Sequence, residues 1–217
     1  MNHAIEPLVD LEARILCVSA TIPTSVVVDR LLRLQSGRDW QRPIWLYLPG
    51  SDGPGTEAPT LSAMDFLTLH AIFRSLRSPV HGVGLGLLRG FEPLLLAACQ
   101  PGHRYLLPSA LCCVGALAVD RLPFSHELGL AVASGASLRE QAAHLIRGQL
   151  DSILAQLQTP ASLWQGPPRL FSAQACIAAG LADRIVPVAD RSLTLNPNPD
   201  HDPELRYHPL PLTPTAS

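Results

Sequence analysis

The chain has 217 residues, of which 47% are hydrophobic, and it carries a formal net charge of −2. This length suits one domain built around a single core. The near-neutral charge, with no block of like charges, argues against nucleic acid or an anionic membrane surface as a partner. The sequence contains no lysine, and this excludes Schiff-base chemistry and Ser-Lys catalytic dyads.

The cysteines, the amino-terminal segment and the apolar runs bear on where the protein works. An odd number of cysteines without metal-type spacing predicts reduced thiols rather than disulfides or a metal centre. The first residues are acidic and have no apolar core, so they do not form a secretory signal. Charged residues and a proline interrupt the longest apolar run, which therefore does not predict a membrane span. We expect a soluble, cytoplasmic protein without a metal or cofactor.

Apolar periodicity and turn residues predict alternating strands and helices, the pattern of an α/β fold. The segment 111–119 is apolar at nearly every position, so we expect a strand buried on both faces. In chain order, the expected elements are a strand at 15–19, a helix at 25–35, strands at 43–48 and 80–85 on either side of a helix at 62–75, a buried helix at 91–99, strands at 105–107 and 111–119, a long helix beginning at 137, a short helix at 172–179 and a strand at 184–188.

The long helix is the strongest single pattern in the chain. Ser137 and Glu140 have the spacing of a capping box, which predicts the start of a helix at this point. Behind the box, apolar residues recur at helical spacing and form one stripe. A helix with such a stripe needs a partner surface. The stripe consists of Leu138, Ala142, Leu145, Ile146, Leu150, Ile153, Leu154 and Leu157.

The composition changes near the carboxyl end. We expect residues 1–190 to form the folded domain and residues 191–217 to form a tail. From Asn196 onward prolines recur and apolar residues are sparse. Such a segment cannot bury a core of its own, so the tail is expected to be disordered.

A search for catalytic and ligand-binding motifs finds no nucleophile elbow, P-loop, metalloprotease helix or complete dinucleotide fingerprint. The glycines between Gly82 and Gly86 are better explained by close backbone packing after a strand. The histidines are scattered, and ordinary surface or satisfied positions are expected for them. Ser109 and Cys113 are the candidates for a relocated nucleophile, although residues in and beside a buried strand are the simpler interpretation.

Several spaced segments together resemble the ClpP family of peptidases, from about Leu8 to Pro187. Their identity and order, rather than any one of them, carry the resemblance. They are Arg14–Val18 (RILCV), Pro43–Leu48 (PIWLYL), Leu94–Pro108 (LLLAACQPGHRYLLP), Arg169–Ala173 (RLFSA) and Ala179–Asp183 (AGLAD). The resemblance implies the ClpP/crotonase-like fold, a spiral of ββα units with a protruding handle helix.

The same resemblance locates the positions of the family's catalytic triad. The nucleophilic serine falls on Gly90, the histidine on Gly115 and the aspartate on Trp164. A serine peptidase needs a nucleophile, a base and an orienting acid in one hydrogen-bonded line. None of these three residues supplies one, so we expect the chain not to be an enzyme by itself. The loop Asp52–Glu57 is longer than in the catalytic members and resembles the non-catalytic ClpR paralogues.

The resemblance also implies partners. A ClpR-like chain would join catalytic ClpP-type subunits in a hetero-oligomeric ring that serves an AAA+ unfoldase of the Clp family. Trp45 and Tyr47 fall on positions that line the unfoldase docking pocket in the family, although core packing would also explain them. The long helix would form the interface between rings, through Leu138, Leu145, Ile146, Leu150, Ile153 and Leu154.

Two other functions remain open. A crotonase-superfamily enzyme that binds acyl-CoA thioesters would share the repeating ββα pattern and would use a backbone oxyanion hole. It needs a carboxylate near the site, for which Glu92 is the candidate, although Glu92 also suits the first turn of a helix. The third possibility is a Clp-type peptidase with relocated catalytic residues.

Overall fold

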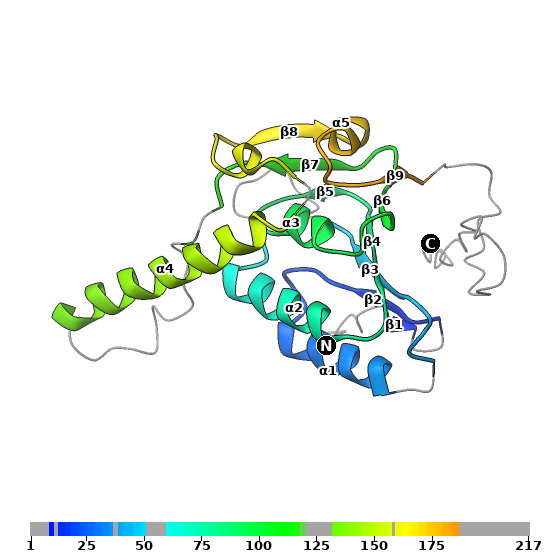
Figure 1. Ribbon diagram of the computed structural model, residues 1–217, viewed down its shortest axis with the longest axis horizontal. Coiled ribbons are helices and arrows are strands. Elements are labelled where there is room, and N and C mark those ends of the chain that lie inside the picture. The colour runs from blue at the N-terminus through cyan, green and yellow to red at the C-terminus, as the bar shows by residue number, and fades with distance from the viewer. Residues whose placement is uncertain are drawn as a thin grey trace, which may run out of the picture.

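The structure, a computed structural model, describes residues 9–10, 13–36, 39–50, 60–117, 119, 132–157 and 159–186, with only the backbone described for 9–10 and 132–139. The predicted tail at 191–217, the loop Asp52–Glu57 and the side chain of Leu138 therefore lie outside the described residues. The structure is a mixed α/β fold with two sheets (Figure 1).

The larger sheet has six strands in the order β1-β2-β3-β4-β6-β9. Neighbouring strands from β2 to β9 run parallel, and β1 pairs antiparallel with β2 at one edge. The central strands carry apolar side chains on both faces, as expected of parallel strands covered by helices or other layers. The strands are β1 (Val9–Asp10), β2 (Ile15–Cys17), β3 (Ile44–Leu48), β4 (Val80–Gly84), β6 (Arg104–Leu106) and β9 (Arg184–Ile185).

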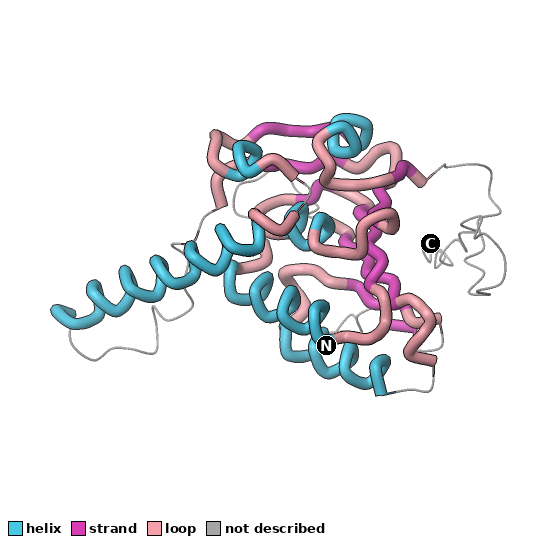
Figure 2. Tube along the Cα trace, viewed as in Figure 1, coloured by secondary structure: helices cyan, strands magenta, loops and turns pink. Residues whose placement is uncertain are grey.

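Three helices pack on one face of this sheet: α1 (Thr24–Ser36), α2 (Ala63–Ser75) and α3 (Glu92–Ala97). The side chains that α1 buries are Val27, Leu31 and Leu34, as its apolar spacing predicted. All six residues of α3 are buried, which confirms the prediction of a buried helix at this point. Figure 2 shows these helices together on one side of the strands. The main core lies in between.

The smaller sheet has the order β5-β7-β8, with β5 (Leu87–Leu88) parallel to β7 (Leu111–Val114) and β7 antiparallel to β8 (Arg169–Ser172). The short helix α5 (Ala173–Ala178) follows β8 directly, with Ser172 as its N-cap and Gly180 in the left-handed region after it. Between β7 and β8 the chain forms the long helix α4 (Val132–Leu154) and the 3-10 helix η2 (Ala161–Trp164). The first part of α4 extends away from the body of the domain (Figure 1).

Two sequence predictions about this region are wrong. The predicted strand 111–119 ends at Val114 and alternates half-buried and buried side chains, because it belongs to the smaller sheet rather than to the central parallel one. The long helix begins at Val132, so Ser137 and Glu140 lie inside it and are not its capping box. In place of the predicted strand 184–188, the structure has the shorter strand β9, which ends at Ile185.

The glycines Gly82 and Gly84 permit close packing on β4, as predicted from the sequence. A Cβ atom at Gly82 would lie 2.7 Å from Leu96 Cδ1 and 2.8 Å from Cys99 Sγ, both on or next to α3. A Cβ atom at Gly84 would lie 2.6 Å from Leu106 Cδ2. Such distances are too short for real side chains, so the absence of side chains here lets α3 and β6 approach β4 closely.

A buried ion pair joins β6 to the chain before β9. Arg104 Nε donates to Asp183 Oδ2 at 2.8 Å, Nη2 donates to Oδ1 at 2.6 Å, and the Arg104 backbone N–H also donates to Oδ2 at 2.9 Å. Arg104 Nη1 donates to the carbonyl of Gly180 at 3.0 Å. Burial by itself would raise the pKa of Asp183, but the hydrogen bonds from Arg104 outweigh it and hold the pKa below its usual value.

We predict that Asp183→Asn lowers the free energy of unfolding by about 3 kcal/mol at neutral pH, because it leaves the Arg104 charge buried without its counter-charge. A carboxylate with a lowered pKa stabilises the fold above its unfolded pKa of about 4 and loses this contribution as pH falls through the folded value. The difference between wild type and variant should therefore shrink below pH 4 in urea titrations.

The control is Asp29→Asn, which removes the exposed Asp29–Arg33 pair on α1, where Nε and Oδ2 lie 2.9 Å apart. This variant should change the unfolding free energy by less than about 1 kcal/mol. Equal effects of the two variants would contradict the role assigned to Arg104.

Candidate functional site

Gly90 lies in a sharp turn between a strand and a helix. The strand β5 ends at Leu88 and α3 begins at Glu92, and Gly90 between them has a φ of +58°. A side chain there would be strained by this backbone conformation, since the left-handed region favours glycine. The position is exposed, and a Cβ atom on it would lie 3.3 Å from Thr60 Cβ. A strand-turn-helix of this kind is the setting in which hydrolases expose a nucleophile.

Gly115 lies at the same end of the smaller sheet as Gly90, where the parallel strands β5 and β7 finish. We call this end of the sheet the carboxyl edge. The parallel strands β5 and β7 pair Leu87 with Leu111 and Leu88 with Cys112, and Gly90 and Gly115 follow the ends of these two strands. A Cβ atom at Gly115 would lie 2.6 Å from Pro168 Cα and 2.7 Å from Pro168 N. These are backbone atoms that no rotamer change can move aside. An imidazole does not fit at position 115.

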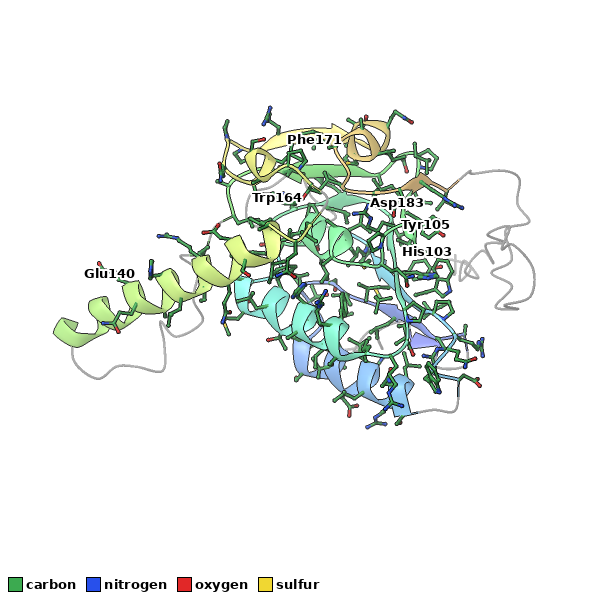
Figure 3. The ribbon with its side chains drawn as sticks, viewed as in Figure 1. His103, Tyr105, Glu140, Trp164, Phe171 and Asp183 are labelled. Carbon is green, nitrogen blue, oxygen red and sulfur yellow. The ribbon has the colours of Figure 1, made fainter. Side chains whose placement is uncertain are left out.

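Trp164 reaches the same edge from η2. The Ala116 N–H donates to the carbonyl of Gly166 at 2.7 Å, which holds the end of this segment beside Gly115. The Trp164 side chain is buried, and its Nε1–H donates to Thr159 Oγ1 at 3.2 Å. Figure 3 shows Trp164 between the end of α4 and the smaller sheet. The indole therefore fills this place as a packed side chain whose only donor is used internally.

The structure thus places the three predicted triad positions near the carboxyl ends of β5 and β7, although they are far apart in the sequence. Gly90 and Gly115 follow these paired strands, and Trp164 belongs to the segment whose Gly166 carbonyl accepts from the Ala116 N–H. Nothing in the side chains of Gly90, Gly115 and Trp164 can attack a carbonyl, accept a proton or orient an imidazole. The two candidates for a relocated nucleophile lie elsewhere: Ser109 is exposed in the turn after β6, and Cys113 is half-buried in β7. Within the described part of the chain, neither is hydrogen-bonded to an imidazole or a carboxylate.

Glu92 is a buried carboxyl group next to this edge. It exposes 2% of its surface, and its Oε2 accepts a hydrogen bond from the Arg89 backbone N–H at 3.0 Å. Burial raises the pKa of Glu92 to about 7, against the opposing effects of the Arg89 hydrogen bond and charge. Such a pKa would suit acid-base chemistry. However, the group is closed off from solvent and closes the turn that contains Gly90, so its place in the structure favours a structural role.

Trp45 and Tyr47 lie on the face of the larger sheet opposite the helices. Trp45 is buried with Val83, Tyr105 and Val186, and Tyr47 is half-buried beside them. The Trp45 ring contacts His81 edge-on at a centroid distance of 4.9 Å, and it lies 5.8 Å from the Tyr105 ring. We call the surface formed by these side chains the aromatic face.

Two histidines that no sequence pattern connects also belong to the aromatic face. The rings of His81 and His103 stack in parallel with centroids 4.0 Å apart, and His103 Nδ1 lies 3.4 Å from the Tyr105 hydroxyl. Burial, followed by the charge of His103, lowers the pKa of His81 to about 4. His81 is therefore neutral at physiological pH. The register between β4 and β6 explains the stack, since both histidines directly precede the paired residues Gly82 and Arg104.

The predicted interface stripe on α4 divides into two parts. Ile146, Leu150, Ile153 and Leu154 are buried in the core of the domain itself. Leu145 is 68% exposed, and it is the described member of the predicted interface that another chain can reach without disturbing this core. The side chain of Leu138 is outside the described residues.

The comparisons with known proteins leave the family open. No protein-family model matches the chain, and no curated protein sequence matches it significantly. Within the described ranges, no three His, Cys, Asp or Glu side chains are grouped so that they could hold a metal ion. None of the helices in the described part of the chain is both long and apolar enough to span a membrane.

We predict that Gly115→Ala lowers the free energy of unfolding by about 2 kcal/mol, because the added methyl group meets the Pro168 backbone and overpacks the site. Gly148→Ala is the matched control. Gly148 lies within α4, where an added Cβ atom meets nothing within 4 Å, and alanine there should stabilise the helix by up to about 1 kcal/mol. Chemical denaturation of both variants checks this, and a neutral Gly115→Ala would contradict the packing described here.

A second prediction concerns Glu92→Gln. A carboxyl group whose folded pKa is raised favours folding while it is protonated, and its contribution falls as pH rises from about 4.5 to about 7. The amide stays neutral and keeps an acceptor for the Arg89 N–H. The variant should match wild type near pH 5 and should be about 2 kcal/mol more stable at pH 8.

The exposed Glu140 on α4 provides the control for this prediction. Glu140→Gln replaces a surface carboxylate and should change the unfolding free energy by less than about 0.5 kcal/mol. If Glu92→Gln instead destabilised the fold equally at pH 5 and pH 8, then the ionised carboxylate would be the form that the fold requires.

Proposed function

We propose that this chain is a non-catalytic, ClpR-like subunit of a Clp-type proteolytic core. In this role it occupies a place in a ring beside catalytic ClpP-type subunits. It contributes to the wall of the chamber and to the surface on which an AAA+ unfoldase docks. It does not hydrolyse peptide bonds by itself.

The observation that carries the proposal is the convergence of Gly90, Gly115 and Trp164. The resemblance assigned these positions to the nucleophile, base and acid by counting along the sequence. Their meeting at one edge, with Gly90 in a strand-turn-helix, supports that assignment. The residues at these positions support a subunit without peptidase activity, since Gly115 has no room for a basic side chain and Trp164 is packed into the core.

The architecture agrees with this proposal. Two sheets that share the helices α3 and α5, with a long helix extending from the body, are what a ClpP/crotonase-like spiral of ββα units with a handle helix would give (Figure 1). The first part of α4 extends from the domain, and Leu145 exposes 68% of its surface. A helix that projects in this way is stabilised by packing against a partner. In the proposed ring, that partner is a subunit of the opposite ring.

The acyl-CoA alternative is less well supported. Its candidate carboxylate, Glu92, exposes 2% of its surface and is held by the turn that it closes. A general acid or base must come within hydrogen-bond reach of its substrate. A thioester would need the turn at Gly90 to open before it could reach this group.

We predict that the tagged chain, purified from its own cells, carries catalytic ClpP-type subunits that native mass spectrometry resolves as mixed rings. Leu145→Asp should reduce this co-assembly about tenfold, since a carboxylate in an apolar contact costs at least about 1.4 kcal/mol. His144→Asp is the control, because His144 is the exposed neighbour of Leu145 on the same helix. Substitution of Ile146 or Ile153 would not be informative, since both are buried in the core of the chain itself.

Two results would count against the proposal. One is a wild-type chain that runs as a monomer in cell extract, and the other is unchanged co-assembly of Leu145→Asp. The purified chain alone should not react with a fluorophosphonate probe. Labelling of a serine such as Ser109 would favour the relocated peptidase instead. Thermal stabilisation by acyl-CoA would favour the crotonase alternative.

A further inference from the structure

The aromatic face is built from strands alone. Its apolar members come from β2, β3, β4, β6 and the residues that directly follow β4, β6 and β9, and no helix of the described residues contributes a side chain to it. Trp45, Val83, Tyr105 and Val186 nevertheless expose only 9%, 5%, 4% and 7% of their surfaces. Figure 2 shows the described helices on the other side of this sheet. Apolar side chains that are buried to this degree, with no described helix above them, require a further chain segment packed over this face.

His81 indicates which polar group a segment lying over this face would have to supply. The residue is 8% exposed, and its Nδ1 is the buried side-chain nitrogen or oxygen without a hydrogen-bond partner among the described residues. A buried polar group without a hydrogen-bond partner destabilises the fold. A neutral imidazole can donate from Nδ1, so a carbonyl oxygen on the covering segment would satisfy it.

The chain itself supplies a segment with the required chemistry. Val186, the last described residue, belongs to the aromatic face, so the chain leaves the domain at this surface. Residues 209–214 read Pro-Leu-Pro-Leu-Thr-Pro. Proline-rich segments form polyproline II helices, which leave their backbone carbonyls free and dock on surfaces lined by aromatic rings.

The chain that follows β9 is long enough for residues 209–214 to reach every strand of the aromatic face. Strands β3 and β9 are separated by β4 and β6, or about 14 Å at about 4.8 Å per strand spacing. Residues 187–208 in an extended polyproline conformation would reach about 68 Å at about 3.1 Å per residue. The segment also lacks a core of its own, and docking on a preformed face does not require one.

We propose that residues 209–214 dock on the aromatic face of the same chain, with the leucines packed against the outer side of the rings of Trp45, Tyr47 and Tyr105 and a backbone carbonyl accepting from His81 Nδ1–H. This docking does not depend on the proposed ring function. If the chain is also a ring subunit, then the segment covers the surface proposed for the unfoldase, and the two would compete for it.

Photocrosslinking of the full chain tests the proposal. With p-benzoylphenylalanine at Tyr47, a half-buried aromatic position on the face, irradiation should link position 47 to the segment 209–214 of the same molecule. The same probe at Trp40, which is 41% exposed and lies outside the aromatic face, should not form this link. A mixture of 15N-labelled and unlabelled chains separates links within one molecule from links between copies. If the Tyr47 variant does not fold, then the half-buried Leu85 on the same face takes the probe.

Leu210→Asp should reduce the yield of this crosslink about fivefold or more, as expected for a loss of at least about 1 kcal/mol. The matched control, Leu193→Asp, lies outside the docking segment and should leave the yield unchanged. The proposal is overturned if no link to residues 187–217 forms, if the links join different copies, or if Leu193→Asp and Leu210→Asp act alike. Failure of the ring proposal would leave these results unaffected, because the crosslink is read on the isolated chain.

Discussion

The ion pair between Arg104 and Asp183 connects β6 to the chain segment that returns from the smaller sheet to the larger one. Arg104 lies in the larger sheet, and its guanidinium reaches Asp183 before β9 and the Gly180 carbonyl after α5. The helix α5 continues directly from β8 of the smaller sheet. The Arg104 side chain therefore ties β6 of the larger sheet to the segment that leads from α5 into β9. Gly90 and Gly115 follow β5 and β7 of the smaller sheet, which is linked to this segment through β8 and α5.

Most elements of the fold were predictable because their apolar spacing reflects simple burial. The helix α1 buries the three residues that its spacing indicated, and α3 is buried all round, as its composition indicated. The strand β7 was predicted too long, since a run of apolar residues does not reveal whether one face or two are covered. The strand β8 was not predicted as a strand: its residues are exposed or half-buried, and pairing with β7, rather than apolar patterning, defines it.

The sequence could nominate residues for the candidate site, but it could not show how they lie relative to one another. Counting along the sequence placed Gly90, Gly115 and Trp164, yet their meeting at one edge depends on the pairing of β5 with β7, which no local pattern encodes. The raised pKa of Glu92 depends on burial by the turn and helix around it. The stack of His81 on His103 arises from the register between β4 and β6. Such properties come from contacts between distant segments.

The crowding at Gly115 limits which side chains position 115 can accept. A side chain at position 90 would be strained by the backbone conformation and would lie close to Thr60, but a side chain at position 115 would collide with backbone atoms of Pro168. A point mutation that encodes histidine there would damage the fold before it could help any reaction. Any larger side chain at position 115 would therefore first require the segment of Pro167 and Pro168 to move or change length. The backbone of a segment distant in the sequence, rather than the local sequence, limits the size of the residue at this position.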